Sequence, residues 1–293
     1  MTAILRLMRP KQWTKNLIVF AGLIFARDLF DHTLALKAGF AFALFCAASS
    51  AVYIFNDILD RDRDRYHPVK RLRPIASGEV SVGRAMVWLV LLALASLALS
   101  PMLGSAFAVV LTAYVLLMLL YSLKLKEIVI LDVMTVAAGF VLRAVGGAVA
   151  INVVISPWLI VCTILLALFL GLSKRRAEIT GLEPEGAQAH RPLLAEYSTG
   201  MLDQMISVVT ASTVLSYCLY TMWPETVQKF NTQNLILTVP FVLYGIFRYL
   251  YLVYRRGEGG SREAVLLNDL PLLANVVLWI VAVVLIVYAA RPG

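Results

Sequence analysis

Charge is scarce in this sequence of 293 residues. Asp, Glu, Lys and Arg together make up 15% of the chain, apolar and aromatic residues make up 60%, and the mean hydropathy is +0.81. A soluble domain cannot hide so large an apolar fraction in its core. The shortage of charge therefore excludes an ordinary soluble globule and predicts an all-α integral membrane protein.

Cysteine and histidine are scarce as well. The three cysteines lie inside apolar runs and form neither a C-x-x-C pair nor a Cys/His cluster, which excludes a zinc site and a disulfide framework. The three histidines have no partner at catalytic spacing, and no Walker loop or dinucleotide fingerprint is present. Hydrolytic triads and nucleotide-fold enzymes are therefore excluded, and no nucleic-acid partner is expected.

Apolar runs define nine predicted membrane spans in one domain that covers residues 1–293. Each run is close to the roughly 20 residues that cross the hydrocarbon core. The first run has no small-residue cleavage site after it, so we interpret it as a retained helix rather than a signal peptide. The predicted spans are 14–30, 34–55, 83–101, 104–122, 128–150, 156–173, 205–223, 235–254 and 270–289.

The positions of Lys and Arg predict how these spans are oriented. With the N-terminus inside, 20 of the 26 basic residues lie in inside segments and only four lie outside. The positive-inside rule then predicts an N-in, C-out protein in the cell (inner or plasma) membrane. All the polar clusters fall on the cytoplasmic side, although many of these charges only set the topology.

One charged stretch, residues 51–78, follows the second span and dominates the polar part of the chain. Asn56, Asp60 and Asp64 are spaced i, i+4 and i+8, which places their oxygens on one face of a helix, and Asp57 lies beside them. An acidic row at the end of a membrane helix is costly without a cation. Oxygen ligands of this kind suit Mg²⁺, so these four residues are the predicted metal ligands.

Basic residues follow this acidic row within a few positions. Lys70 and Arg73 lie in a segment stiffened by two prolines, and His67 precedes it. Acidic groups for a metal and basic groups for phosphate together predict a diphosphate site. The alternative is a solvated loop in which Asp and Arg pair with each other.

Two further polar clusters have simpler alternatives. Tyr121 and Lys124 share one face at the end of the fourth span, with Lys126 following, although by themselves they fit an interfacial tyrosine with snorkelling lysines better than a site. Lys174 and Arg175 end the sixth span with Glu178 behind them. Arginine suits phosphate oxygens, but positive-inside anchoring also accounts for this cluster.

Ionisable groups inside a predicted span form the last candidates. Asp132 and Arg143 lie about three turns apart in the fifth span, and Arg143 either pairs with a carboxylate or contacts a ligand. Glycines near Arg143 permit close helix packing. At the N-terminus, Lys15 and Asn16 are placed to reach a cavity, whereas the preceding basic residues fit an interfacial helix. The pair at 268–269 fits a helix N-cap.

The pattern Asn56-Asp57-x-x-Asp60-x-x-x-Asp64, followed by residues 73–78, resembles the UbiA superfamily of intramembrane prenyltransferases. The Tyr121-x-x-Lys124 pair is also similar to a motif of that superfamily. The resemblance covers essentially the whole chain. It implies nine helices in a UbiA-like bundle around a cytoplasm-facing cavity.

Residues 173–178 depart from the prenyltransferases of that superfamily. Members that transfer a prenyl group carry a second aspartate-rich motif there, whereas this chain reads Ser-Lys-Arg-Arg-Ala-Glu. One branch, the decaprenyl-phosphate phosphoribosyltransferases, resembles this chain at that segment and at four others. The other four segments are 9–16, 64–70, 121–126 and 139–147.

That resemblance implies Mg²⁺-dependent transfer of 5-phosphoribose from phosphoribosyl diphosphate to a polyprenyl phosphate, for cell-envelope polysaccharide precursors. It implies catalytic roles for Asp57, Asp60, Asp64 and Lys124. Substrate-binding roles fall on Lys15, Asn16, Asn56, His67, Lys70, Arg73, Tyr121, Lys126, Arg143, Lys174, Arg175 and Glu178. The alternatives are a prenyltransferase that uses an aromatic acceptor, and a non-enzymatic transporter or lipid scaffold. A homo-oligomer is left open.

Overall fold

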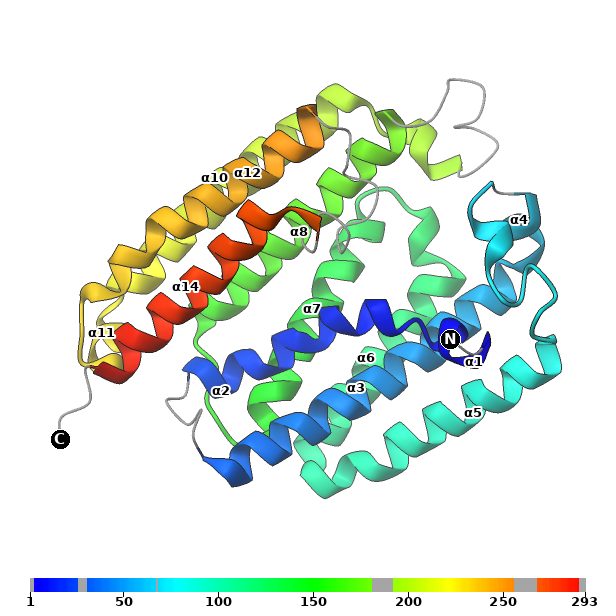
Figure 1. Cartoon of the computed structure of the whole chain (residues 1–293), viewed down its shortest axis with the longest axis horizontal. Helices are drawn as coiled ribbons and strands as arrows, with labels where there is room; N and C mark the ends of the chain where they lie inside the picture. Colours follow the sequence, from blue (N-terminus) through cyan, green and yellow to red (C-terminus); the bar gives the residue numbers. More distant parts are fainter. Residues whose placement is uncertain (1–2, 26–30, 67, 181–191, 256–267, 290–293) are drawn as a thin grey trace. The chain divides into compact units, whose positions relative to one another are not determined.

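The computed structural model describes residues 3–25, 31–66, 68–180, 192–255 and 268–289 (Figure 1). Every regular element in these ranges is a helix, and the chain divides into two compact units, Met1–Ile155 and Ser156–Gly293. Eight of the described helices are long and apolar enough to cross a membrane. The all-helical, multi-pass architecture predicted from composition is therefore confirmed.

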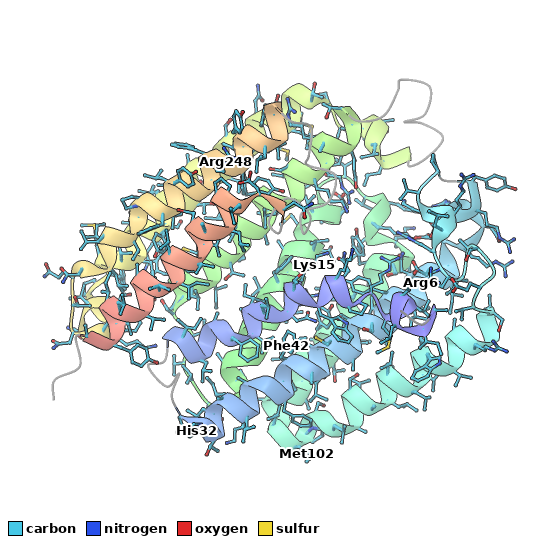
Figure 2. The ribbon with its side chains drawn as sticks, in the orientation of Figure 1. Arg6, Lys15, His32, Phe42, Met102 and Arg248 are labelled. Atoms are coloured by element: carbon cyan, nitrogen blue, oxygen red, sulfur yellow. The ribbon has the colours of Figure 1, made fainter. Side chains whose placement is uncertain are left out.

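The described residues of the first unit form seven α-helices and four 3-10 helices. In chain order they are α1 (Ala3–Met8), η1 (Pro10–Phe20), α2 (Ala21–Phe25), α3 (His32–Leu59), α4 (Arg61–Tyr66), η2 (Lys70–Leu72), α5 (Val82–Leu99), η3 (Ser100–Leu103), α6 (Ser105–Leu123), η4 (Leu125–Glu127) and α7 (Leu131–Ala150). Figure 2 shows Arg6 on α1, Lys15 on η1 and Phe42 on α3. Helix α3 packs against η1, α5, α6 and α7, which makes it the central element of this unit.

The predicted span 14–30 differs from the other eight in its helix type. It consists of η1, which is 11 residues long, and the short helix α2, while residues 26–30 lie outside the described ranges. Runs of 3-10 helix longer than three or four residues are uncommon. With rises of about 2.0 Å per residue in η1 and 1.5 Å in α2, the two elements extend for roughly 30 Å.

Glycines of α7 allow this helix to approach its neighbours closely, as their spacing predicted. A Cβ atom on Gly147 would lie 2.0 Å from the carbonyl oxygen of Val19 in η1, and one on Gly146 would lie 2.6 Å from the ring of Phe45. The same Phe45 ring meets Phe107 and Tyr114 of α6 edge-on, at centroid distances of 5.8 and 5.4 Å. Small residues thus bring η1, α3 and α7 together around an aromatic core.

The second unit contains four long helices in the part that the structure describes. Its elements are α8 (Pro157–Thr180), η5 (Pro192–Glu196), α10 (Thr199–Met222), α11 (Pro224–Phe230), η6 (Asn234–Thr238), α12 (Val239–Arg255) and α14 (Leu270–Ala289). Helix α10 packs against α8 and α12, and α12 packs against α14 (Figure 1). Asp269 caps α14 by accepting a hydrogen bond from the Leu272 amide at 2.9 Å, which agrees with the predicted N-cap.

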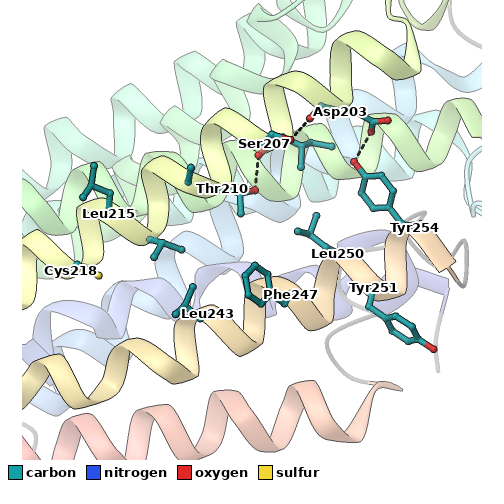
Figure 3. A pocket seen from close by; sticks show the side chains of 13 residues that line it. Asp203, Ser207, Thr210, Leu215, Cys218, Leu243, Phe247, Leu250, Tyr251 and Tyr254 are labelled. Carbon is teal, nitrogen blue, oxygen red and sulfur yellow. Dashed lines mark hydrogen bonds between the residues drawn. The ribbon is translucent and has the colours of Figure 1, made fainter.

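A groove of about 1000 Å³ follows α10 and α12 of the second unit (Figure 3). Most of its wall is apolar, with Leu215, Leu243 and Phe247 among the lining side chains. Asp203 and Tyr254 lie at its polar end and are joined by a hydrogen bond of 2.5 Å from the tyrosine hydroxyl. The groove belongs to two apolar helices long enough to cross a membrane, where hydrocarbon is the surrounding solvent.

Candidate active site

The acidic row is built where α3 passes into α4. The amide of Asp60 donates to the carbonyl of Asn56 at 2.9 Å, and the amide of Asp64 donates to the carbonyl of Asp60 at 2.8 Å. These i to i+4 bonds continue the helical rise across the junction. Asn56, Asp60 and Asp64 therefore keep the spacing of one helical face, and the side-chain amide of Asn56 donates to Asp60 at 3.0 Å.

Arg73 joins two of the predicted metal ligands. Its Nη1 atom lies 3.0 Å from Oδ1 of Asp57 and 2.5 Å from Oδ2 of Asp64. Both acidic residues are only 3% exposed, so each carboxylate needs a compensating positive charge. One guanidinium nitrogen thus lies between two buried carboxylates, and the loop after η2 is what carries it there.

Lys126 provides the corresponding cation for Asp60. It comes from η4, directly after α6, and its Nζ atom lies 2.7 Å from Oδ1 of Asp60 and 3.4 Å from Oδ1 of Asn56. Lys124, the predicted catalytic lysine of this segment, is exposed at the end of α6, and Tyr121 precedes it there, half-buried. Lys126, rather than the predicted Lys124, is thus the lysine that contacts the acidic row.

Arg9 is a member of this cluster that sequence reasoning placed elsewhere. We expected the basic residues before Lys15 to lie in an interfacial lead-in helix, yet the guanidinium of Arg9 forms an ion pair with Asp57. It also lies over the ring of Tyr53, with Cζ 5.3 Å from the centroid. The available signal was the Arg-Pro pair at 9–10, which marks a break between two helices that can aim a side chain back at α3.

Arg143 and Asn16 lie in a second, fully buried polar network. The three nitrogens of Arg143 donate to Oδ1 of Asn16 at 2.6 Å, to the Gly139 carbonyl at 3.0 Å and to the Tyr114 hydroxyl at 2.6 Å. Asn16 in turn donates to Cys46 at 3.2 Å. Within the described residues no carboxylate pairs with Arg143, so the predicted ion-pair alternative is not what the structure presents.

The other predicted residues of the first unit lie near these two networks in sequence. Lys15, in η1, donates a hydrogen bond to Gln12. Lys70 is half-buried at the start of η2. His67 lies outside the described residues.

The second unit carries the predicted cationic cluster on the last turns of α8. Nη1 of Arg175 lies 2.5 Å from Glu178, and Lys174 lies 3.6 Å from the same carboxylate. Arg176, which the sequence did not single out, pairs with Asp203 of α10 at 2.5 Å and stacks on Tyr254 of α12, with Cζ 3.8 Å from the ring centroid. The end of α8 thus carries three consecutive cations, which contact the carboxylates of Glu178 and Asp203.

The donor set in the first unit fits a hard divalent cation such as Mg²⁺. Asn56, Asp57, Asp60 and Asp64 offer only amide and carboxylate oxygens, and positively charged nitrogens already lie against them. Among the described residues no three His, Cys, Asp or Glu side chains converge on one point as a complete metal cage.

Comparisons with known proteins identify the family. The model of the UbiA prenyltransferase family matches residues 16–270. The chain belongs to the UbiA prenyltransferase family. It is therefore a transferase, as predicted, and the alternative of a non-enzymatic transporter or lipid scaffold is excluded.

Two relatives of this UbiA chain are named decaprenyl-phosphate phosphoribosyltransferase. The protein from Corynebacterium glutamicum is 34% identical over 97% of this chain and 86% of its own length. The one from Mycolicibacterium smegmatis is 32% identical over 95% of this chain and 90% of its own length. The predicted resemblance to the decaprenyl-phosphate phosphoribosyltransferase branch is therefore confirmed by sequence identity over nearly the whole chain.

The fold is also that of a solved structure, a UbiA homologue from Archaeoglobus fulgidus bound to GPP and Mg²⁺. Its TM-score is 0.72 at 18% identity, and the match covers 98% of this chain and 100% of that one. A second structure of the homologue, bound to DMAPP and Mg²⁺, gives a TM-score of 0.70. At this identity the likeness concerns the fold.

Proposed function

We propose that this UbiA-family protein transfers 5-phosphoribose from phosphoribosyl diphosphate to a polyprenyl phosphate of the decaprenyl type. A phosphate oxygen of the lipid attacks C1 of the ribose, the C1–O bond to the diphosphate breaks, and diphosphate leaves with the electron pair. The attacking oxygen is already an anion, so the reaction needs no general base. The product is a lipid-linked phosphoribose, and we propose that it serves cell-envelope polysaccharide synthesis.

The observation that carries this proposal is the cationic end of α8. Lys174, Arg175 and Arg176 are three consecutive basic residues at the position where a prenyltransferase would be expected to carry a second acidic motif. The two substrates carry four phosphate groups between them and require more positive charge than one diphosphate does. The names of the relatives, which are at least 32% identical over nearly all of this chain, support the same reaction.

The chain's own residues divide into two groups by charge. Asn56, Asp57, Asp60 and Asp64 would hold Mg²⁺, which when bound neutralises charge on the leaving diphosphate. Arg73 and Lys126 lie against those carboxylates and are placed to bind phosphate oxygens beside the metal. We assign further phosphate contacts to Lys15, Lys70, Lys124, Lys174 and Arg175. Tyr121 and His67 would hydrogen-bond the substrates, and Glu178 would orient a cation or bind a ribose hydroxyl.

Asn16 and Arg143 remain in the proposed substrate-binding set, and we assign them an indirect role. Both are buried and bonded to each other, so their effect on substrate would pass through the position of η1 rather than through an exposed contact. Lys15, the neighbour of Asn16, lies on that same element.

For topology, we propose nine spans with the N-terminus inside and the C-terminus outside, in one UbiA-like domain. Elements η1 and α2 together rise far enough to count as the ninth span. The site would then face the cytoplasm from the plasma membrane, because residues 56–73 and 124–126 follow the second and fourth spans. Oligomerisation remains open.

A donor panel tests the proposed reaction against its competitor, a prenyltransferase with an aromatic acceptor. The full-length protein in detergent or nanodiscs is given Mg²⁺ and one of two substrate pairs: phosphoribosyl diphosphate with farnesyl or decaprenyl phosphate, or a prenyl diphosphate with an aromatic acid. All products are identified by mass spectrometry. We expect a phosphoribosylated lipid. A prenylated aromatic acid, with no phosphoribosylated lipid, would refute the proposal. Omission of Mg²⁺, or addition of EDTA, should stop product formation.

A further inference from the structure

Arg9 has a backbone conformation that amino acids with a side chain seldom adopt. Its φ and ψ angles are 54° and 61°, in the left-handed region, and Pro10 follows it. Such a conformation persists only where neighbouring contacts enforce it, and it often marks a functional position. The structure therefore holds Arg9 against its local preference.

Contacts on both sides of Arg9 enforce this conformation. The hydroxyl of Ser50, on α3, lies 2.9 Å from the Met8 carbonyl oxygen and 2.7 Å from the Cys46 carbonyl oxygen, which share it as donor, and it accepts from the indole nitrogen of Trp13 at 3.0 Å. The residues before and after Arg9 are thus fastened to the same point of α3. Further along η1, the buried bond from Arg143 to Asn16 fixes the element to α7.

With its backbone in this conformation, Arg9 directs its side chain toward the acidic row. Its guanidinium reaches Asp57, which already has a 3.0 Å contact with Arg73. Asp57 therefore contacts two arginines, and one of them, Arg73, is shared with the buried Asp64. Over the whole cluster, three carboxylates face three cations: Asp57, Asp60 and Asp64 against Arg9, Arg73 and Lys126.

Arg9 retains donors for a further anion. In the described part of the chain, its one hydrogen bond from the side chain is the Nη2 contact with Asp57, and its Cζ lies over the Tyr53 ring. A guanidinium carries five N–H donors in a planar fork that suits two phosphate oxygens. Its other nitrogens can thus bind phosphate while the side chain keeps its orientation.

We propose that Arg9 is a phosphate-binding residue of the transfer site, held in place by Asp57 until substrate arrives. This inference rests on the proposed function, since it concerns the same site. The ligand chemistry is a phosphate or diphosphate oxygen, from either the sugar donor or the lipid acceptor. Sequence position alone would assign Arg9 to the membrane surface.

Binding measurements on the full-length protein test whether Arg9 binds phosphate, and whether that phosphate belongs to the sugar donor or to the lipid acceptor. Arg9→Ala and Arg9→Lys are compared with Arg6→Ala, which removes the same charge from the same segment but breaks only a pair with the exposed Glu79. Arg9→Gly removes the guanidinium and also relieves the positive φ. Calorimetry in detergent then measures inorganic pyrophosphate with Mg²⁺, farnesyl phosphate, and Mg²⁺ alone.

We expect Arg9→Ala to weaken pyrophosphate or farnesyl phosphate binding about tenfold or more, as the loss of a hydrogen bond to a charged group would. The anion that is weakened identifies the source of the phosphate. Arg6→Ala should change neither by more than about twofold. Mg²⁺ alone should bind Arg9→Ala at least as tightly as wild type, because a competing cation has left Asp57. Arg9→Lys should keep part of the anion affinity, and Arg9→Gly should match the alanine variant in binding while melting at a higher temperature.

Two results would overturn the inference. In one, both anions bind Arg9→Ala within twofold of wild type. In the other, Mg²⁺ and anion affinities fall together with thermal stability, which would give Arg9 a purely structural role.

Product analysis of wild type distinguishes failure of this inference from failure of the proposed function. Phosphoribosylated lipid with unchanged anion binding in Arg9→Ala refutes the role of Arg9 alone. No such lipid, but a clear loss of anion binding in Arg9→Ala, refutes the proposed reaction and supports Arg9.

Discussion

Replacing Gly147 by alanine tests whether the close approach of α7 to η1 supports the site. The added Cβ would lie 2.0 Å from the Val19 carbonyl oxygen and 2.7 Å from its carbonyl carbon, and contacts under 3.0 Å are essentially never seen. Both neighbours are backbone atoms, so no rotamer change can relieve the overlap. The two elements must separate by about 1 Å, which strains the bond from Arg143 to Asn16.

The cost follows from these two effects. Overpacking in a filled interior costs about 1–3 kcal/mol, and weakening a hydrogen bond to a charged group adds about 1 kcal/mol or more. We therefore expect Gly147→Ala to lower stability by at least about 2 kcal/mol, or the Tm by roughly 4–8 °C. The assay is thermal unfolding of the full-length protein in detergent, followed by intrinsic fluorescence.

The matched control for this variant is Gly39→Ala. Gly39 lies in α3 of the same unit, and a Cβ there meets no atom within 4 Å. This substitution should leave stability unchanged or raise it by about 0.5–1 kcal/mol, since alanine favours a helix over glycine. If Gly147→Ala melts at or above the temperature of Gly39→Ala, the argument from close packing is refuted.

Three further predictions concern single side chains. Asp60→Asn should abolish transfer while leaving the protein folded, because it removes the carboxylate paired with a lysine and proposed to hold Mg²⁺; turnover and circular dichroism measure both effects. Tyr114→Phe should destabilise the protein by about 1–3 kcal/mol, because it leaves a buried nitrogen of Arg143 without its acceptor; thermal unfolding measures this. Asp269→Ala should cost about 1–3 kcal/mol in the same assay, because it removes both the cap of α14 and the pair with Arg248 at 2.8 Å.

Each of these three substitutions has a matched control, in which the same type of residue is changed at an exposed position. Asp62→Asn changes a carboxylate that contacts only its exposed arginine neighbours in the described part of the chain, and should retain activity. Tyr244→Phe removes the hydroxyl of a tyrosine that is 47% exposed, and should unfold like wild type. Asp31→Ala removes an exposed cap of α3 and should cost less than Asp269→Ala. An effect of equal size in any control would contradict the corresponding structural argument.

Some of these features were available from the sequence because they depend on local periodicity. The eight long helices follow from apolar runs, since backbone groups in hydrocarbon must bond within their own segment. The four-residue steps from Asn56 to Asp64 predicted a shared face, and the hydrogen bonds across the α3–α4 junction maintain it. Gly147 was predicted to allow close packing from its spacing alone.

Other features required the tertiary structure, because they join residues far apart in the chain. The Arg-Pro pair at 9–10 indicates a break between helices, but it does not identify Asp57 as the partner of Arg9. That pairing depends on the packing of this segment on α3, where Ser50 contacts residues on both sides of Arg9. The choice of Lys126 over Lys124 depends on where η4 turns after α6. The sequence determines the charge of each side chain, but tertiary packing determines its partner. In this protein, packing brings Arg9, Arg73 and Lys126, from three separate segments, to one acidic row.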